Sequence, residues 1–164
     1  MKKTDEKLKI NLGGRDAKEG FKEVQSLGCI KAETVEEIWC SHLLQRIPGK
    51  ERAQLVEDVW RVLIPDGKAI FVTPYWTSMK AVADFRNQWP PISEMSYLFF
   101  NRKWCLDNKV EVLKCNFIWT VGYMLDGETN SRSVEAQQHW VKHYTNAVLD
   151  LHATLTKKGL DDLQ

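Results

Sequence analysis

The histidine at position 42 has the residue type and the place in the sequence that proton transfer requires. It directly follows EEIWCS, a run that is typical of a buried strand with a polar end. Open α/β sheets bind ligands at the carboxyl ends of such strands, and a neutral imidazole there can accept a proton from a hydroxyl or an amine. Two interpretations are open for His42: contact with a ligand, or a helix cap formed with its neighbour Ser41.

Asp84, in the segment ADFRNQW, is a second candidate, because its carboxylate could act as a base. The competing interpretation is a solvated residue on a helix, and the surrounding sequence favours it. Asn87, three positions later, has an amide side chain and is not a base at all.

The segment LKINLGGRD offers chemistry of another kind, which is backbone contact with a ligand. Apolar and polar residues alternate in it as in a strand, and Gly13 and Gly14 end the run. Adjacent glycines after a strand let the backbone approach a nucleotide, but they also form plain tight turns. Dinucleotide sites need three spaced glycines, whereas Arg15 follows here, so the stretch taken alone favours the plain turn.

The spacing of histidines and cysteines does not predict a metal site. His139 and His143 lie four residues apart, which lets two imidazoles share a metal, but no nearby Glu or third His completes the set. The four cysteines form no CxxC pair, and Cys40 and Cys115 lie in apolar runs typical of buried, reduced thiols. We therefore expect no metal and a reducing, cytoplasmic location.

Charge and hydropathy exclude several classes of partner. The chain has 23 Lys and Arg against 22 Asp and Glu, so no general nucleic-acid surface is expected. The longest apolar stretch, residues 117–125, is too short to span a bilayer, and the N-terminus lacks the apolar core of a signal peptide. The length of 164 residues fits a single domain over 1–164.

The hydrophobic pattern predicts strands alternating with helices, followed by two strands that pair antiparallel. Helical spacing begins at Gly49, and the turn Pro65-Asp66-Gly67 should end that helix before a parallel strand. Strands are expected over residues 8–12, 21–26, 36–42, 68–74, 110–125 and 151–158, and helices over 79–89, 93–101 and 134–148. Tyr75 and Trp76 follow a strand, where they either wall a ligand pocket or cover the end of the sheet.

The order of these elements resembles that of class I S-adenosylmethionine-dependent methyltransferases. In that family a helix ends in Arg-Val-Leu-Lys-Pro-Gly-Gly, and residues 61–67, RVLIPDG, keep this frame. NLGG at 11–14 resembles the family's first motif, Asn-Leu-Gly-Cys/Ser-Gly, and EEIWCSH at 36–42 resembles Asp-Glu-Ile-Tyr-Ala-Ser-His. Residues 84–104 and 143–157 resemble parts of a branch found among phage and metagenomic methyltransferase-like proteins.

The resemblance implies a Rossmann-like methyltransferase sheet of class α/β, mostly parallel with an antiparallel C-terminal strand. It also implies S-adenosylmethionine as cofactor and methyl transfer to an unidentified acceptor. The catalytic candidates are then His42 and Asp84. The residues expected to bind the cofactor are Asn11, Leu12, Gly13, Gly14, Gln25, Ser41 and His42.

Two departures from the family pattern favour an alternative. Gln25 stands where the family has an aspartate that holds the ribose, and an amide lacks that charge. Only ten residues lie between Gln25 and Glu36, where relatives fit a helix and a third strand, so the sheet should be abbreviated around its second and third strands. The alternative is a degenerate methyltransferase-fold protein without catalysis, a binding or scaffold module.

The cleft beside the glycine turn should discriminate between these functions. A hollow the size of adenosine next to Gly13 and Gln25 supports the enzyme, whereas filling by Trp39 or Leu27 supports the alternative. A homodimer is expected if several of the seven tryptophans are exposed.

Overall fold

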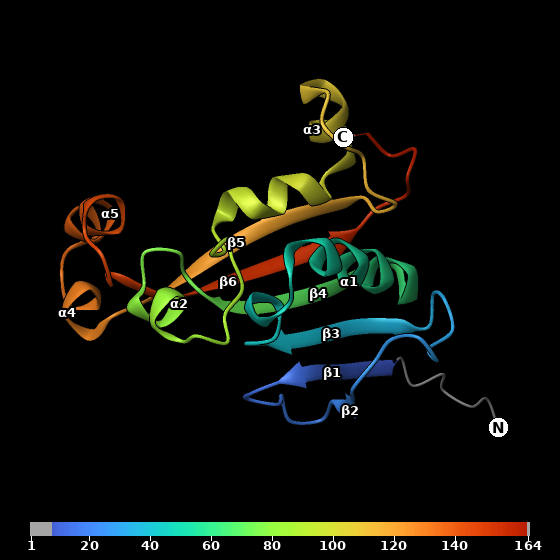
Figure 1. The fold of residues 1–164 in the computed structure, drawn as a ribbon, viewed down its shortest axis with the longest axis horizontal. Helices are drawn as coiled ribbons and strands as arrows, with labels where there is room; N and C mark the ends of the chain where they lie inside the picture. The colour runs from blue at the N-terminus through green and yellow to red at the C-terminus, as the bar shows by residue number, and fades with distance from the viewer. Residues whose placement is uncertain (1–7, 164) are drawn as a thin grey trace.

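A computed structural model describes residues 8–163, which form one six-stranded sheet (Figure 1). The strand order is β2-β1-β3-β4-β6-β5. The first four of these strands are parallel, β6 is antiparallel to β4, and β5 is antiparallel to β6. The strands are β1 (Leu8–Gly14), β2 (Lys22–Val24), β3 (Val35–Ser41), β4 (Leu63–Pro74), β5 (Phe117–Leu125) and β6 (Val148–Lys157).

The mixed sheet confirms the predicted fold class, including its abbreviated region. Between β2 and β3, residues 25–34 contain no strand, and the connection from β1 to β2 over residues 15–21 contains no helix. Parallel strands are usually joined through a helix, so this short loop needs other support. Asn11 supplies it: its Oδ1 accepts from Lys18 N at 2.9 Å, and its Nδ2 donates to Lys18 O at 3.0 Å.

Helices gather at both ends of the sheet as well as over one face. In Figure 1, α2, α4 and α5 lie near the end toward which the arrows of β1 and β3 point, and α3 lies at the opposite end. The helices are α1 (Gly49–Val62), α2 (Met79–Ala83), α3 (Arg102–Asn108), α4 (Gly127–Asn130) and α5 (Val134–His143). Two 3₁₀ helices, η1 (Leu44–Arg46) and η2 (Glu94–Phe100), complete the described elements.

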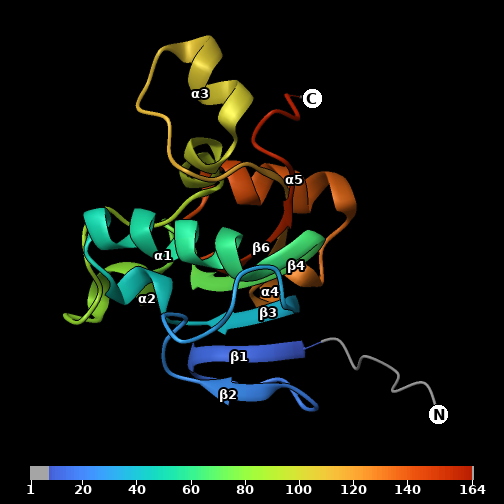
Figure 2. The ribbon, with the colours of Figure 1, turned by 90° about the vertical axis from the view of Figure 1, so that its right-hand side faces the viewer.

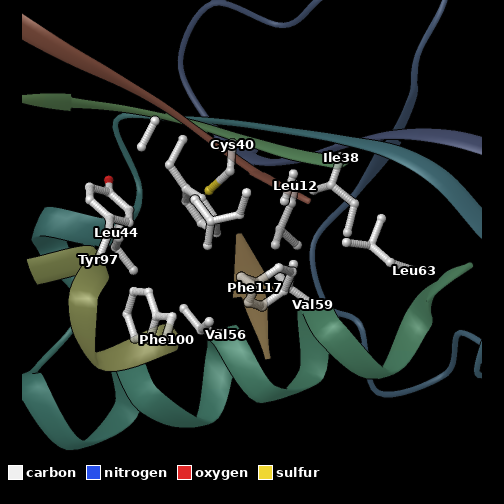
Figure 3. Packing of buried hydrophobic residues seen from close by; sticks show 14 of the residues in the cluster. Leu12, Ile38, Cys40, Leu44, Val56, Val59, Leu63, Tyr97, Phe100 and Phe117 are labelled. Atoms are coloured by element: carbon white, nitrogen blue, oxygen red, sulfur yellow. The ribbon is translucent and has the colours of Figure 1, made fainter. Parts of the chain in front are cut away.

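The hydrophobic core lies between α1 and one face of the sheet (Figure 3). Val56 and Val59 of α1 are fully buried near Ile38 of β3 and Phe117 of β5. Burial of each such side chain contributes about 1.5–3 kcal/mol to stability. In Figure 2, α1 runs alongside the central strands, so its apolar face fixes the position of β3 and β4.

The opposite face of the sheet carries mostly polar side chains. Lys68 pairs with Thr156 and Ile70 with Thr154 in the β4–β6 ladder, and all four side chains are exposed or half-buried. Thr120 of β5, opposite Thr154, is exposed. Strand alternation therefore separates an apolar face under α1 from a face that is open to solvent.

Two helix predictions were too long. The segment 79–89 is helical only to Ala83, because Asp84 accepts a hydrogen bond from Arg86 N at 3.1 Å and Asn87 Nδ2 donates to Lys80 O at 3.0 Å. Such side-chain bonds to nearby backbone compete with helix continuation. The last helix likewise ends at His143, and Val148 already belongs to β6.

Two strand predictions had wrong starting points. β4 begins at Leu63, directly after α1, and includes the turn residues expected to precede it. Leu63 pairs with Val35 and Lys68 with Glu37, so β4 holds extra residues that bulge out of the ladder. β5 begins at Phe117 rather than at residue 110, since residues 110–116 pair with no strand.

Candidate functional site: two cavities at the carboxyl edge of the sheet

Two neighbouring cavities lie at the carboxyl ends of the parallel strands, on either side of α2. The charged cavity, of about 580 Å³, is lined by Arg15, Asp16, His42, Gln45, Arg46, Pro74, Lys80, Ala83, Asp84 and Asn87. The aromatic cavity, of about 930 Å³, has among its lining residues Tyr75, Trp76, Met79, Glu94, Tyr123 and Tyr144. Open α/β sheets bind ligands at this edge, where the strand order reverses.

His42 directly follows the carboxyl end of β3 and has an unusual backbone conformation. Its φ is 55°, in the left-handed region, and its N–H donates to Val72 O at 2.8 Å. A non-glycine residue in that region costs about 1 kcal/mol or more and is frequent at functional sites. The turn directs the imidazole into the charged cavity, as the sequence position suggested.

The imidazole of His42 faces a buried carboxylate. Its Nε2 is 4.0 Å from Asp150 Oδ1, while Lys80 Nζ is 3.1 Å from Asp150 Oδ2. Burial lowers the pKa of His42 below its usual value, although the Asp150 charge opposes that shift. His42 is therefore neutral at neutral pH and able to accept a proton.

Several buried polar atoms around the charged cavity have no hydrogen-bond partner within residues 8–163. They are Gln45 Oε1, Arg46 Nε, Asn87 Oδ1 and Asp150 Oδ1. Buried polar groups are nearly always partnered, because an unsatisfied one costs about 1–3 kcal/mol. Donors and acceptors that converge on one cavity without partners are suited to a polar ligand.

Arg52 fixes the wall that carries these atoms. Its buried guanidinium donates to the carbonyl oxygens of Ile47 at 2.7 Å and Pro90 at 2.7 Å. It also donates to those of Gln88 at 2.8 Å and Gln45 at 3.3 Å. One side chain thus joins η1, α1 and the loop before η2 beneath the charged cavity.

Asp84 lines the charged cavity but is a poor base. Arg86 Nε donates to its Oδ1 and Arg86 Nη2 to its Oδ2, both at 2.8 Å. These hydrogen bonds hold the pKa of Asp84 far below its usual range. A carboxylate that stays ionised fits an electrostatic role better than the role of a proton acceptor.

The aromatic cavity is organised around a single carboxylate. Tyr75 OH and Tyr123 OH donate to Glu94 Oε1 at 3.2 and 3.0 Å. The rings of Tyr75 and Tyr123 meet edge to face with centroids 5.6 Å apart, and Trp76 is 52% exposed beside them. Of the two interpretations of Tyr75 and Trp76, the wall of a pocket is the one confirmed.

Comparison with known proteins finds similarity only at the level of structure. No protein-family model matches the sequence, and no curated protein sequence matches it. An S-adenosylmethionine-dependent methyltransferase from Archaeoglobus fulgidus superposes with a TM-score of 0.57 at 13% identity, over 84% of this chain and 68% of that one. The chain has the fold of these methyltransferases.

A second similar structure is geranyl diphosphate C-methyltransferase from Streptomyces coelicolor, determined with Mg²⁺, geranyl diphosphate and S-adenosyl-L-homocysteine. Its TM-score is 0.50 at 12% identity, over 84% of this chain. The match covers 54% of the Streptomyces chain, so this chain spans about half of that larger enzyme.

In this methyltransferase fold the glycine turn packs against the neighbouring strand. Gly14 has a φ of 85°, and a Cβ there would lie 1.8 Å from Ser41 O. Arg15 N donates to the same oxygen at 3.0 Å. Close backbone approach to β3 therefore explains the glycine, whereas neither Gly13 nor Gly14 lines either cavity.

Except for His42, the other residues expected to bind the cofactor also lie outside the linings of both cavities. Asn11 is engaged in the β1–β2 loop, Leu12 is in the core, and Ser41 is buried. Gln25 follows β2 and is exposed. Of the residues that the sequence suggested, the charged cavity brings together His42 and Asp84.

Side chains pack against the glycine turn and the loop that follows it. Trp39 Nε1 donates to Asp16 O at 2.8 Å, and Leu27 is buried. Lys18 Nζ lies 5.5 Å from the centroid of the Trp39 ring, closing the loop over it. Trp39 and Lys18 thus cover the loop after the glycine turn, and the side chain of Leu43 lies 3.3 Å from a Cβ built at Gly13.

Asp150 was not identified from the sequence, although the hydrophobic pattern around it is a signal of a buried carboxylate. Asp150 interrupts the apolar run AVLDLHATL, and a carboxylate at 3% exposure within a strand marks a site. Lys80 and Glu94 left no such signal, because each lies in the first turn of a helix, where charged residues are common.

The ring centroids of His139 and His143 lie 4.4 Å apart. No group of three or more His, Cys, Asp or Glu side chains that could hold a metal ion occurs in residues 8–163. Within the same residues, no helix is long and apolar enough to cross a membrane.

Proposed function

We propose that this protein is an S-adenosylmethionine-dependent methyltransferase. The charged cavity would hold the methionine end of the cofactor, and the acceptor would occupy the neighbouring aromatic cavity. The unpartnered buried atoms of Gln45, Arg46, Asn87 and Asp150 carry this proposal, because they converge where the fold binds ligands.

The charges of the cavity fit the methionine end of that cofactor. This end has a carboxylate, an ammonium and a positively charged sulfur. Arg15, Arg46 and Lys80 are suited to the carboxylate, and Asp84 and Asp150 to the two cationic groups. Both signs of charge are needed, and the cavity supplies both.

When bound, S-adenosylmethionine supplies an electrophilic methyl group on a sulfonium, which leaves as a neutral thioether. His42 would accept the proton of a hydroxyl or amine acceptor whose reacting group reaches from the aromatic cavity into the charged cavity, and Asp150 would stabilise the resulting imidazolium. The rest of the catalysis would be positioning, because α2 holds the two cavities side by side.

The adenosine end finds fewer partners than the methionine end. Gln25 keeps an amide for the ribose hydroxyls but is exposed, and the indole of Trp39 is hydrogen-bonded to Asp16 O in the loop after the glycine turn. This disagreement favours a second candidate function, a binding module that keeps the fold without transfer. A cytoplasmic location, a homodimer and the relationship to phage proteins stay predictions of the sequence.

Calorimetric titration with S-adenosylmethionine and S-adenosylhomocysteine tests the proposal. Arg15→Gln removes a cation whose side chain lines the charged cavity, and it should weaken both ligands about tenfold, typical of a lost charge-assisted contact. Arg102→Gln, on α3 at the other end of the sheet, is the matched control. Absence of heat at millimolar ligand with a folded protein would favour the binding module.

A further inference from the structure

The aromatic cavity has a composition that methyl transfer alone does not explain. Its wall is mostly apolar, and within the described chain Glu94 is the one carboxylate among its lining residues. Lys142, the lysine of the lining, is exposed on α5, as is the neighbouring His143. A single inner carboxylate in an apolar wall selects for charge as well as for shape.

The Glu94 carboxylate is only half satisfied. Its Oε1 accepts from both Tyr75 OH and Tyr123 OH, but its Oε2 is buried with no hydrogen-bond partner among the residues that the structure describes. A buried carboxylate oxygen without a donor is costly, so a ligand that brings a donor is favoured. A cationic donor gains more than a neutral one.

The neighbouring rings suit the same kind of ligand. Tyr75 meets Tyr123 at 69° with centroids 5.6 Å apart, and Trp76 at 64° with centroids 6.1 Å apart. All three rings line the aromatic cavity, and the faces of aromatic rings attract cations. Burial raises the pKa of both phenols, and the Glu94 charge adds to the shift, so they remain donors to Glu94.

We propose that the aromatic cavity binds a mostly apolar molecule carrying a protonated amine, with the ammonium against Glu94 and the apolar body among Tyr75, Trp76 and Tyr123. Binding of such an amine does not require methyl transfer. Assigning this molecule as the methyl acceptor does rest on the proposed function, and the methyl group would then go to a second, unprotonated group of the molecule, because an ammonium has no lone pair.

Three probes of matched shape test this binding in the full chain without cofactor: 2-phenylethylamine, 2-phenylethanol and 3-phenylpropionate. They carry the same ring with a cationic, neutral or anionic end. Calorimetry or ligand-observed NMR should show the amine binding about tenfold or more tightly than the alcohol, with the anion weakest.

Glu94→Gln keeps an acceptor for the two phenols and removes the charge, so it should abolish the preference for the amine over the alcohol. Glu111→Gln, exposed and outside both cavities, is the matched control and should keep the preference. Trp76→Ala, at a half-exposed position that the fold tolerates, should weaken all three probes.

Equal affinity for amine and alcohol, preference for the anion, or an unchanged preference in Glu94→Gln would each overturn the inference. So would the absence of binding by all three probes at millimolar concentration to a folded chain. Because no cofactor is present, failure of S-adenosylmethionine to bind is a separate result and concerns the charged cavity alone.

Discussion

The carboxyl edge of the sheet is packed differently on the two sides of β3. On the β1 side the edge is closely packed. Gly14 lies against Ser41 O, and the Trp39 indole donates a hydrogen bond to Asp16 O in the following loop. On the β4 side the edge stays open, and polar atoms around His42 have no partners. The same edge of the sheet therefore has one side that is closely packed and one side where buried polar atoms lie without partners.

The largest effect is expected on the closed side. Gly14→Ala places a methyl 1.8 Å from Ser41 O at a φ of 85°, so β1 and β3 must separate. We expect a loss of about 3 kcal/mol or more in the free energy of unfolding, measured by urea denaturation. Gly127→Ala, where a Cβ meets nothing within 4 Å, should change stability by about 0.5 kcal/mol or less. A tolerated Gly14→Ala would show that the turn is open enough for a ligand.

A smaller loss of stability is expected on the open side from Arg52→Met. The change removes the guanidinium donor from four carbonyl oxygens, those of Gln45, Ile47, Gln88 and Pro90. Of these, Gln45 O keeps the hydrogen bond that Gln88 N donates at 2.8 Å. We expect about 2 kcal/mol of destabilisation together with loss of ligand binding in the charged cavity. Binding of 2-phenylethylamine in the aromatic cavity should survive in the folded variant. Unchanged ligand binding in the charged cavity would mean that this wall does not shape the site.

Trp39→Phe tests whether the β1 side of β3 takes part in binding the cofactor. It removes the indole N–H that donates to Asp16 O at 2.8 Å and keeps an aromatic ring. The expected cost is about 1 kcal/mol in urea denaturation, with no loss of affinity for S-adenosylmethionine. A clear loss of affinity in calorimetry would place the cofactor on the β1 side instead.

The smallest effect is a dependence of stability on pH. Burial lowers the pKa of folded His42, so the unfolded chain binds a proton more readily. Stability should therefore fall as the pH drops below about 6.5, the usual histidine pKa, toward the lower folded value. In His42→Asn, whose side chain tolerates the left-handed backbone, this part of the fall should vanish, by about 1 kcal/mol or less. Identical pH profiles for the two proteins would show that His42 is not buried as described.

The sequence predicted the framework of the sheet better than its details. Apolar alternation in Leu8–Gly14 and Val35–Ser41 located two parallel strands, because buried strands leave a periodic signal. The ends of α2 and the start of β4 depended on local side-chain bonds and on a bulge, which hydrophobic periodicity does not record.

A residue of the candidate site could be predicted from the sequence where its position depends on a single element. His42 could be found because it ends a strand that the sequence marks clearly. Lys80 and Asp150 meet at 3.1 Å although they are 70 residues apart, so their pairing follows from tertiary structure alone. Cofactor binding by the glycine turn stays a prediction, and the packing of Gly14 against Ser41, which lies on another strand, could likewise not be read from the sequence.

Mapping of S-adenosylhomocysteine by backbone amide chemical shifts tests the account most directly. If the open side holds the ligand, shifts should be largest at His42, Arg46 and Asn87, and the amides of Gly14 and Gln25 should hardly move. Shifts centred on Gly14 and Gln25 would contradict the account and return the glycine turn to the role of a cofactor loop.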